Sequence, residues 1–168
     1  CFVRTFPGNL VTFCQLINDG ADIIAPFQDT IKTIVEICAA NGIHCFGCNS
    51  DAYELDPETW LSACVNSPEG WLEYIKKAID GEYETVSVIG SMDVGLEDLG
   101  TYGDSVSEEI RSQVEAVKQQ ILDGTFHVFE GPVYDQNGNE VIASGVVPTF
   151  EEINNFNFLV QGVNGSLN

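Results

Sequence analysis

The chain has 168 residues, and 26 acidic side chains against six basic ones give it a formal net charge of −20 at pH 7. This charge repels nucleic-acid phosphates and anionic membrane surfaces, so neither is an expected partner. A hydrophobic share of 44% is typical of a packed globular protein. Apolar runs stop far short of the roughly 20 residues that cross a bilayer. We therefore expect no membrane span in this chain and no signal peptide in its first residues.

The first 65 residues alternate between short β-rich runs and helical stretches. Apolar side chains at positions 10, 13, 14, 16 and 17 have helical spacing, and Gly20 ends this helix. Asp29 or Thr30 caps a second helix, which ends at Asn41-Gly42. The predicted elements are strands at 2–5, 23–25, 43–48 and 61–65 and helices at 10–19 and 30–41. Helices between apolar strands indicate right-handed crossovers and a parallel sheet, hence an α/β fold.

The second half of the chain is less regular. Pro68 begins a helix that ends at Gly81, and a strand is predicted at 85–89. A capping-box pattern at 105–108 opens a helix that ends at Gly124. Asn137-Gly138 predicts a β-hairpin over 133–142 with a type I′ turn, and a short acidic helix follows near 149–154. The apolar stripe of the helix after Pro68 consists of Trp71, Leu72, Ile75, Ala78 and Ile79.

All six cysteines lie within the first 64 residues, and Cys45 and Cys48 have CxxC spacing. A redox pair of this kind should open a helix whose dipole lowers the thiol pKa, but here it lies inside a predicted strand. A zinc site needs a second ligand pair, and only Cys38 and Cys64 are available, without matching spacing. Core packing explains these cysteines best, and a redox or zinc protein that uses the CxxC pair is the alternative.

Other motifs that carry chemistry are weak. Asp135, Asn137 and Asn139 resemble the first half of a calcium loop, but Glu140 and Val146 stand where that loop needs glycine and glutamate. The sequence has no nucleophile elbow, and its two histidines offer little material for a triad. We therefore expect no enzyme, no metal site and no cofactor.

Polar and aromatic residues gather at the predicted carboxyl ends of the parallel strands. Phe6 follows the first strand, Phe27-Gln28-Asp29 the second and Asn49-Ser50-Asp51 the third. Ligands of parallel α/β sheets bind at this edge. Aromatic faces can hold a flat heterocycle there, while amide and carboxylate groups bond its nitrogens or hydroxyls. These residues are candidate ligand contacts, and ordinary strand-ending turns are the alternative.

Short segments along nearly the whole chain resemble, in the same order, motifs of one family. They are GADIIA at 20–25 with QDT at 28–30, GCNSD at 47–51, LSACV at 61–65, DG at 80–81, FEGP at 129–132, DQNG at 135–138 and VQGV at 160–163. This is the basic membrane protein family, the substrate-binding proteins and lipoproteins of ABC transporters, which includes purine nucleoside receptors. The resemblance implies a type I periplasmic-binding-protein fold, in which two α/β lobes close on a ligand.

The resemblance also implies that this chain is about the C-terminal half of such a protein. Residues 1–67 are then lobe two, residues 68–81 a helix of the first lobe, and residues 82–168 the return to lobe two with a C-terminal hairpin. The family's ligand contacts fall on Gly47 and Asn49, in a motif that also holds Asp51, while Phe6, Phe27, Gln28 and Asp29 lie on loops that face the cleft. Asp93 ends a segment in which Met92 replaces the lysine of nucleoside-binding members.

The expected function is that of a solute-binding component of an ABC-type uptake system. Its ligand would be a purine nucleoside, a purine base or a similar polar heterocycle, and its protein partners would be ABC permease subunits. Such proteins are periplasmic, extracellular or surface lipoproteins. A ligand-sensing receptor of the same fold that does not transport is the alternative within this class.

Overall fold

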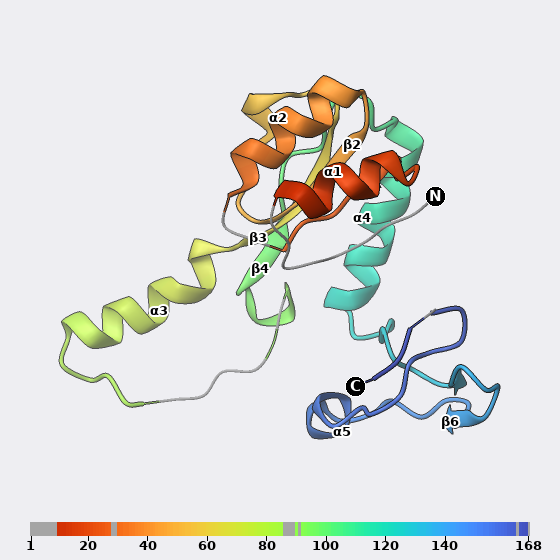
Figure 1. The fold of residues 1–168 in the computed structure, drawn as a ribbon. Helices are drawn as coiled ribbons and strands as arrows, with labels where there is room; N and C mark the ends of the chain where they lie inside the picture. Colours follow the sequence, from red (N-terminus) through yellow and green to blue (C-terminus); the bar gives the residue numbers. More distant parts are fainter. Residues whose placement is uncertain (1–9, 28–29, 86–89, 91, 164, 168) are drawn as a thin grey trace. The chain divides into compact units, whose positions relative to one another are not determined.

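The computed structural model of the chain describes residues 10–27, 30–85, 90, 92–163 and 165–167. It divides into two compact units, residues 1–116 and 117–168, which are treated separately below. Figure 1 labels the helices and strands along the chain. The predicted strand at 2–5 lies outside the described residues. Of the predicted strand at 85–89, only Thr85 is described.

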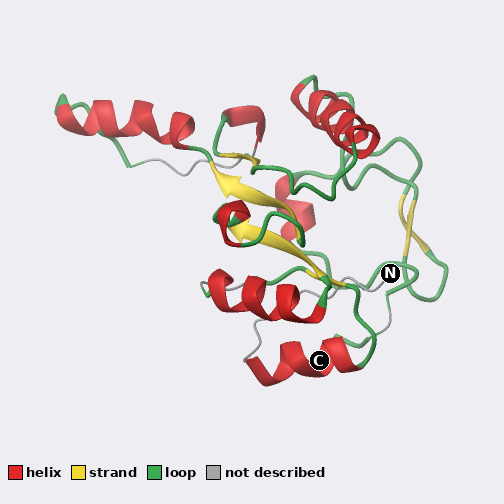
Figure 2. Cartoon of the chain, turned by 90° about the horizontal axis from the view of Figure 1, so that it is seen from above, coloured by secondary structure: helices red, strands yellow, loops and turns green. Residues whose placement is uncertain are grey.

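A four-stranded sheet with the order β1-β2-β3-β4 forms the centre of the first unit. Strands β1 (Ile23–Ile24), β2 (His44–Asn49) and β3 (Trp60–Asn66) are parallel, as the sequence predicts, whereas β4 (Glu97–Leu99) runs antiparallel to β3. Figure 2 shows the two longest strands, β2 and β3, side by side. A short 3-10 helix, η1 (Tyr53–Leu55), lies between them in sequence.

Helices α1 (Leu10–Asn18) and α2 (Ile31–Asn41) have the predicted bounds to within a residue. Both end at a glycine with a left-handed backbone: φ is +92° at Gly20 and +64° at Gly42. A residue without a Cβ adopts this conformation at little cost, which is why glycine ends helices so often. Thr30 occupies the N-cap position of α2, but its side chain makes no capping hydrogen bond.

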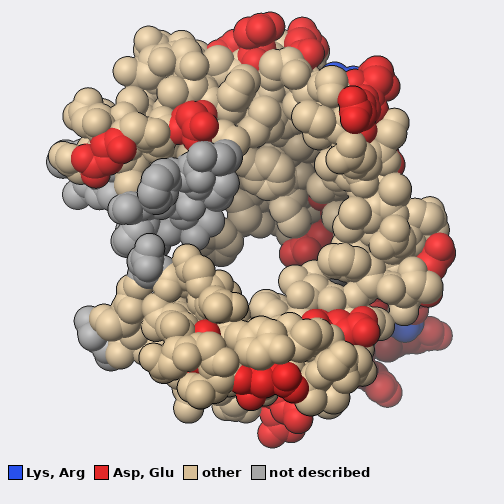
Figure 3. All heavy atoms as spheres, turned by 90° about the vertical axis from the view of Figure 1, so that its right-hand side faces the viewer, with Lys and Arg blue, Asp and Glu red and all other residues tan. Residues whose placement is uncertain are grey.

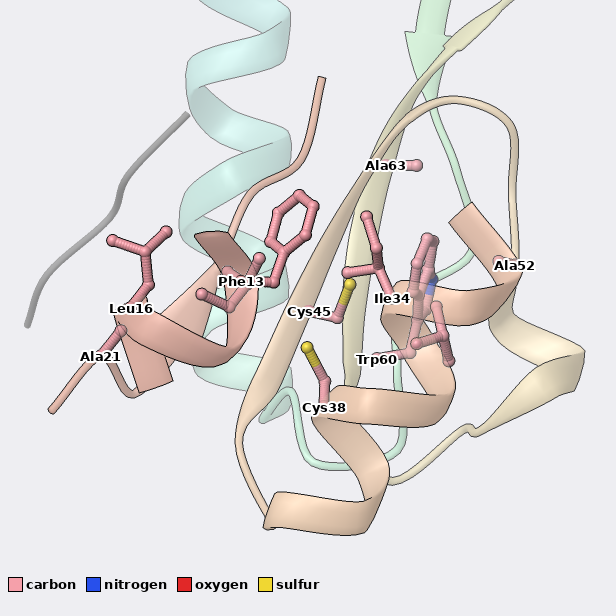
Figure 4. Close-up of a cluster of buried hydrophobic side chains, with 11 residues drawn as sticks. Phe13, Leu16, Ala21, Ile34, Cys38, Cys45, Ala52, Trp60 and Ala63 are labelled. Atoms are coloured by element: carbon pink, nitrogen blue, oxygen red, sulfur yellow. The ribbon is translucent and has the colours of Figure 1, made fainter. Parts of the chain in front are cut away.

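The core of the first unit is one cluster of buried side chains from both helices and the sheet (Figure 4). Its fully buried members with the largest volumes are Trp60, Phe13, Ile24, Ile34, Val35, Cys38 and Cys45. Each large apolar side chain buried in this way stabilises the fold by about 1.5–3 kcal/mol. The Trp60 indole N–H donates to the Thr101 carbonyl at 3.1 Å, so its one polar group is satisfied.

Helix α3 (Pro68–Ile79) is amphipathic, but none of its residues is buried. In Figures 1 and 2 it extends away from the sheet of its unit. Its predicted apolar stripe is exposed, with fractions of 50% for Trp71, 47% for Leu72, 52% for Ile75 and 77% for Ile79. At its first turn, the Gly70 N–H donates to the Gly95 carbonyl at 3.0 Å, just after the 3-10 helix η2 (Met92–Val94).

Helix α4 (Glu108–Leu122) confirms the predicted helix that ends near Gly124, but its cap is not the predicted one. Ser107, rather than Ser105, accepts the Ile110 N–H, at 3.3 Å. The Tyr102 hydroxyl donates to Glu115 at 2.9 Å, and the Arg111 guanidinium lies 5.7 Å from the centre of the Tyr102 ring. Burial and the bond to Glu115 raise the pKa of Tyr102 to about 12. These contacts hold the start of α4 against the preceding loop.

The second unit contains the predicted hairpin, β5 (Val133–Tyr134) with β6 (Glu140–Ile142), and the short helix α5 (Phe150–Asn154). The predicted type I′ turn is wrong. That turn needs two residues with positive φ, and here only Gly138 has one, at +82°. Asp135 shapes the turn instead, because its carboxylate accepts the backbone N–H of Asn137 and of Asn139 and the Asn139 amide, at 2.8–2.9 Å. The calcium-like pattern is therefore a hydrogen-bonded turn.

Candidate ligand-binding edge

The candidate ligand-binding residues that the structure describes lie mostly where the sequence places them, at the carboxyl ends of β1 and β2. Phe27 follows β1, Gly47 and Asn49 belong to β2, and Asp51 follows β2. Phe6, Gln28 and Asp29 lie outside the described residues. Because β1 and β2 are parallel neighbours, their ends meet at one edge of the sheet.

Asn49 ends β2 in a left-handed conformation, with φ at +63°, and it is exposed. Among the described residues it is the only non-glycine with a positive φ. Asparagine tolerates this conformation better than other residues with a side chain. The turn leaves the Asn49 amide at the strand end, free to serve a ligand as both donor and acceptor.

Asp51 ties the loop after β2 to the chain after β4. One oxygen of its carboxylate accepts the Thr101 N–H at 2.6 Å and the other accepts the Tyr53 N–H at 3.0 Å. Partial burial opposes ionisation, but these hydrogen bonds outweigh it and hold the pKa of Asp51 below its usual range. A second tie runs in parallel, from the Tyr53 hydroxyl to Asp104 at 3.0 Å. The carboxylate of Asp51 thus shapes the loop that carries Asn49.

Gly47 is buried, and its neighbours leave no room for a side chain. A Cβ at this position would lie 2.3 Å from Cη2 of Trp60 and 3.0 Å from the Ala63 Cβ. The structure therefore gives a packing reason for glycine here, alongside the ligand contact that the family resemblance implies.

An apolar cavity of about 480 Å³ lies beside this edge. Successive residues of a strand point to opposite faces of the sheet, so Phe46 and Cys48 lie on the face opposite the buried Cys45. Phe27 forms part of the wall and is 63% exposed. The complete lining is Ile23, Ala25, Pro26, Phe27, Phe46, Gly47, Cys48, Leu61 and Cys64. Sequence reasoning missed Phe46 and Leu61, although alternation within the strand was a signal for the former.

Asp93 lies in η2, in the segment that contacts the first turn of α3 through Gly95. It follows β3 and α3 in the chain, whereas Asn49 and Asp51 flank the end of β2. The sheet topology thus groups Phe27, Gly47, Asn49 and Asp51 at one edge, whereas Asp93 belongs to a separate segment.

The CxxC pair is divided between the two faces of β2. Cys45 is fully buried in the core, whereas Cys48, three residues on, lines the cavity. Contact with the Cys38 thiol together with burial raises the pKa of Cys45. Among the described residues, no group of three or more His, Cys, Asp or Glu side chains could hold a metal ion. A redox or zinc site built from Cys45 and Cys48 is therefore not favoured.

Among the charged side chains, acidic groups far outnumber basic ones. On the face shown in Figure 3, carboxylates are spread widely and basic groups are scarce. Three ion pairs join described residues, and in each pair the two partners are three or four residues apart on the same helix. Each pair has at least one largely exposed partner. The pairs are Lys32–Glu36, Lys77–Glu73 and Arg111–Glu108. Within the described part of the chain, no helix is long and apolar enough to span a membrane.

Two curated relatives of this chain are named as binding proteins. A purine-binding protein of Brucella abortus is 27% identical over 153 residues, which are 90% of this chain and 43% of that protein. An ABC transporter glucose-binding protein of Haloferax volcanii is 27% identical over 156 residues, or 90% of this chain and 36% of that protein. The chain thus spans less than half the length of these curated relatives. No protein-family model matches it.

A solved structure has the same fold over much of the chain. It is that of a transcriptional activator of the comK gene from Bacillus halodurans, with a TM-score of 0.61 and 24% identity over 70% of this chain and 42% of that one.

The resemblance to substrate-binding proteins of the basic membrane protein kind is confirmed by the two curated relatives. Both are named as binding proteins, which agrees with the expectation of a non-enzyme.

Proposed function

We propose that this chain is the ligand-binding lobe of a solute-binding protein that serves an ABC-type uptake system. The observation that carries the proposal is the edge of the parallel sheet, where an apolar cavity with two phenylalanines adjoins the exposed amide of Asn49. The names of both relatives, one purine-binding and one a glucose-binding protein of an ABC transporter, support the same class.

The chemistry of this edge favours a purine base or nucleoside over a sugar. Phe27 and Phe46 offer aromatic faces, and stacking of aromatic rings contributes about 0.5–1.5 kcal/mol beyond burial. The Asn49 amide can pair with a ring nitrogen and an exocyclic group at the same time. A sugar, with hydroxyls in every direction, requires more polar partners than a cavity lined by apolar and sulfur-bearing side chains provides.

Helix α3 supports the presence of another lobe, the first lobe, outside this chain. Its exposed apolar stripe forms a face that soluble proteins normally cover, and more than half of each curated relative lies outside the matched region. On this proposal residues 68–81 pack on a first lobe, and residues 1–67 and 82–168 form lobe two of a type I periplasmic-binding-protein fold. The hinge crossings are then Asn66-Ser67 and 81–85. The whole protein would act outside the cytoplasm and deliver its ligand to ABC permease subunits.

Calorimetric titration of a full-length protein, extended to the length of its relatives, tests the ligand. We expect binding of a purine base or nucleoside and none of glucose, and at least a tenfold loss of affinity, about 1.4 kcal/mol, in Asn49→Ala and in Phe27→Ala. Phe126→Ala is the matched control, because Phe126 is a part-exposed phenylalanine of the second unit. Unchanged affinity in a Phe27→Ala/Asn49→Ala double variant would overturn the assignment of the site, and tight glucose binding would overturn that of the ligand.

Hydrogen exchange tests the two-lobe arrangement. In the isolated 168-residue chain we expect weak amide protection over residues 70–80, which rises in the extended protein when the stripe is covered. Equal, strong protection in a proven monomer of the isolated chain, together with tight ligand binding, would show that the chain is a complete domain by itself.

A further inference from the structure

The register of the sheet brings two cysteines of different strands side by side. Cys48 of β2 and Cys64 of β3 are Cα partners in the parallel ladder. Neighbouring strands lie about 4.7–4.9 Å apart, and disulfides join Cα atoms that are about 4.4–6.8 Å apart. Partners in a parallel ladder also point to the same face of the sheet. The strand register therefore places the two Cα atoms at a separation that a disulfide can span.

Both thiols are accessible from the cavity. Cys48 and Cys64 are half-buried free cysteines that line its wall. The other close pair differs in this respect: Cys38 and Cys45 interact and lie near each other in Figure 4, but both are sealed in the core. A small oxidant or a thiol reagent can thus reach the first pair without unfolding the protein.

A carboxylate stands beside Cys64. Glu97 of β4 lies within hydrogen-bonding reach of the Cys64 thiol, and burial together with this carboxylate raises the pKa of Cys64. Cys64 is therefore protonated at neutral pH, and its thiol must lose this proton when the sulfur reacts.

We propose that Cys48 and Cys64 form a disulfide that joins β2 to β3 along the cavity wall. The two thiols lose two protons and two electrons as the S–S bond forms. A disulfide-carrying oxidant, such as oxidised glutathione or an oxidised thiol–disulfide oxidoreductase, accepts the electrons and becomes two thiols. The presence of such an oxidant rests on the proposed extracytoplasmic function, whereas the pairing itself rests on the strand register.

The bond would act directly on the candidate ligand-binding edge. Cys48 immediately precedes Asn49, so a tether at this point fixes the end of β2 relative to β3. It also replaces two separate thiols in the cavity wall by one rigid link. We therefore expect the oxidised protein to resist urea better than the reduced protein.

Peptide mapping after equilibration in glutathione buffers, from reducing to oxidising, tests the pairing. Free thiols are alkylated in denaturant, and cleavage after glutamate then separates residues 37–54, with Cys38, Cys45 and Cys48, from residues 59–69, with Cys64. We expect the oxidised chain to carry two alkyl groups fewer and to yield a cross-link between these fragments that fragment spectra assign to Cys48. Cys48→Ser and Cys64→Ser should each abolish the cross-link, whereas Cys14→Ser, at an exposed thiol of α1, should retain it.

Full alkylation of both fragments at every glutathione ratio would overturn the proposal, and so would a cross-link from Cys64 to Cys38 or Cys45. Circular dichroism of each serine variant identifies a loss of cross-link that comes from misfolding, and the unsubstituted chain gives its answer without any variant. Ligand titration is a separate measurement. Failure of the cross-link with purine binding intact therefore refutes the disulfide alone, and the reverse result refutes only the proposed function.

Discussion

Replacement of Gly47 by alanine tests whether this glycine is required by packing. The new methyl group would lie 2.3 Å from Cη2 of Trp60, whereas carbon atoms pack at about 3.5–4.0 Å. Trp60 must therefore move by more than an ångström, although it is fully buried and held by its bond to Thr101. Overpacking of this kind costs about 1–3 kcal/mol, and the smaller entropy of an unfolded chain with alanine offsets about 0.4–1 kcal/mol.

We expect Gly47→Ala to lower the free energy of unfolding by about 1–2 kcal/mol, measured by urea titration with circular dichroism. Gly165→Ala is the control, because its methyl group would make only an ordinary contact, 3.5 Å from Leu159. Trp60→Phe removes the atom that clashes, so the double variant should be more stable than the sum of the single effects predicts, by about 1 kcal/mol. Additive effects within about 0.5 kcal/mol would refute the steric explanation.

Three further predictions concern charge and thiols. Because 26 acidic side chains face only six basic ones, an increase of NaCl from about 0.1 M to about 1 M, which shortens the screening length from about 10 to 3 Å, should raise the melting temperature by several degrees; an unchanged melting temperature would count against self-repulsion. Asp51 has a lowered pKa in the folded state, so its ionised form stabilises the fold at neutral pH and this contribution is lost as pH falls below about 4. Asp51→Asn should therefore be less stable than the parent chain at pH 7, with a difference that shrinks in acid, whereas a constant difference would show that charge has no part. Cys45 should resist thiol reagents in the native protein while the exposed Cys14 reacts, and rapid labelling of Cys45 in a mass-spectrometric time course would disprove its burial.

Local signals account for the elements that the sequence predicted correctly. Apolar spacing and the glycines at 20 and 42 fixed α1 and α2 because these features act within one helix. Strand β4 escaped prediction, since its three residues include two acids and form a strand only by pairing with β3. The sequence predicted Ser105 as the cap of α4, whereas the structure has Ser107. Two candidate serines that are two residues apart cannot be ranked by pattern alone.

The candidate site was only partly predictable from the sequence, because part of it depends on the pairing of distant strands. Strand ends can be read from the chain, so Phe27, Asn49 and Asp51 were identified as candidates. The cavity beside them depends on which residues of β3 face β2, and that register is a long-range property. The CxxC spacing drew attention to Cys45 and Cys48, whereas the register places Cys64 next to Cys48.

The contact between Gly70 and Gly95 determines the direction in which α3 leaves the first unit's sheet. A Cβ on Gly70 would lie 2.3 Å from the Gly95 carbonyl oxygen, so the helix and the loop meet backbone to backbone. The nine residues of α3 that follow Gly70 extend about 14 Å beyond this contact, and a tilt of about 10° at Gly70 displaces the far end by about 2 Å. The direction in which α3 presents its apolar stripe thus depends on the close approach of Gly70 and Gly95. A methyl group added at Gly70 would clash with the Gly95 carbonyl and would change that direction.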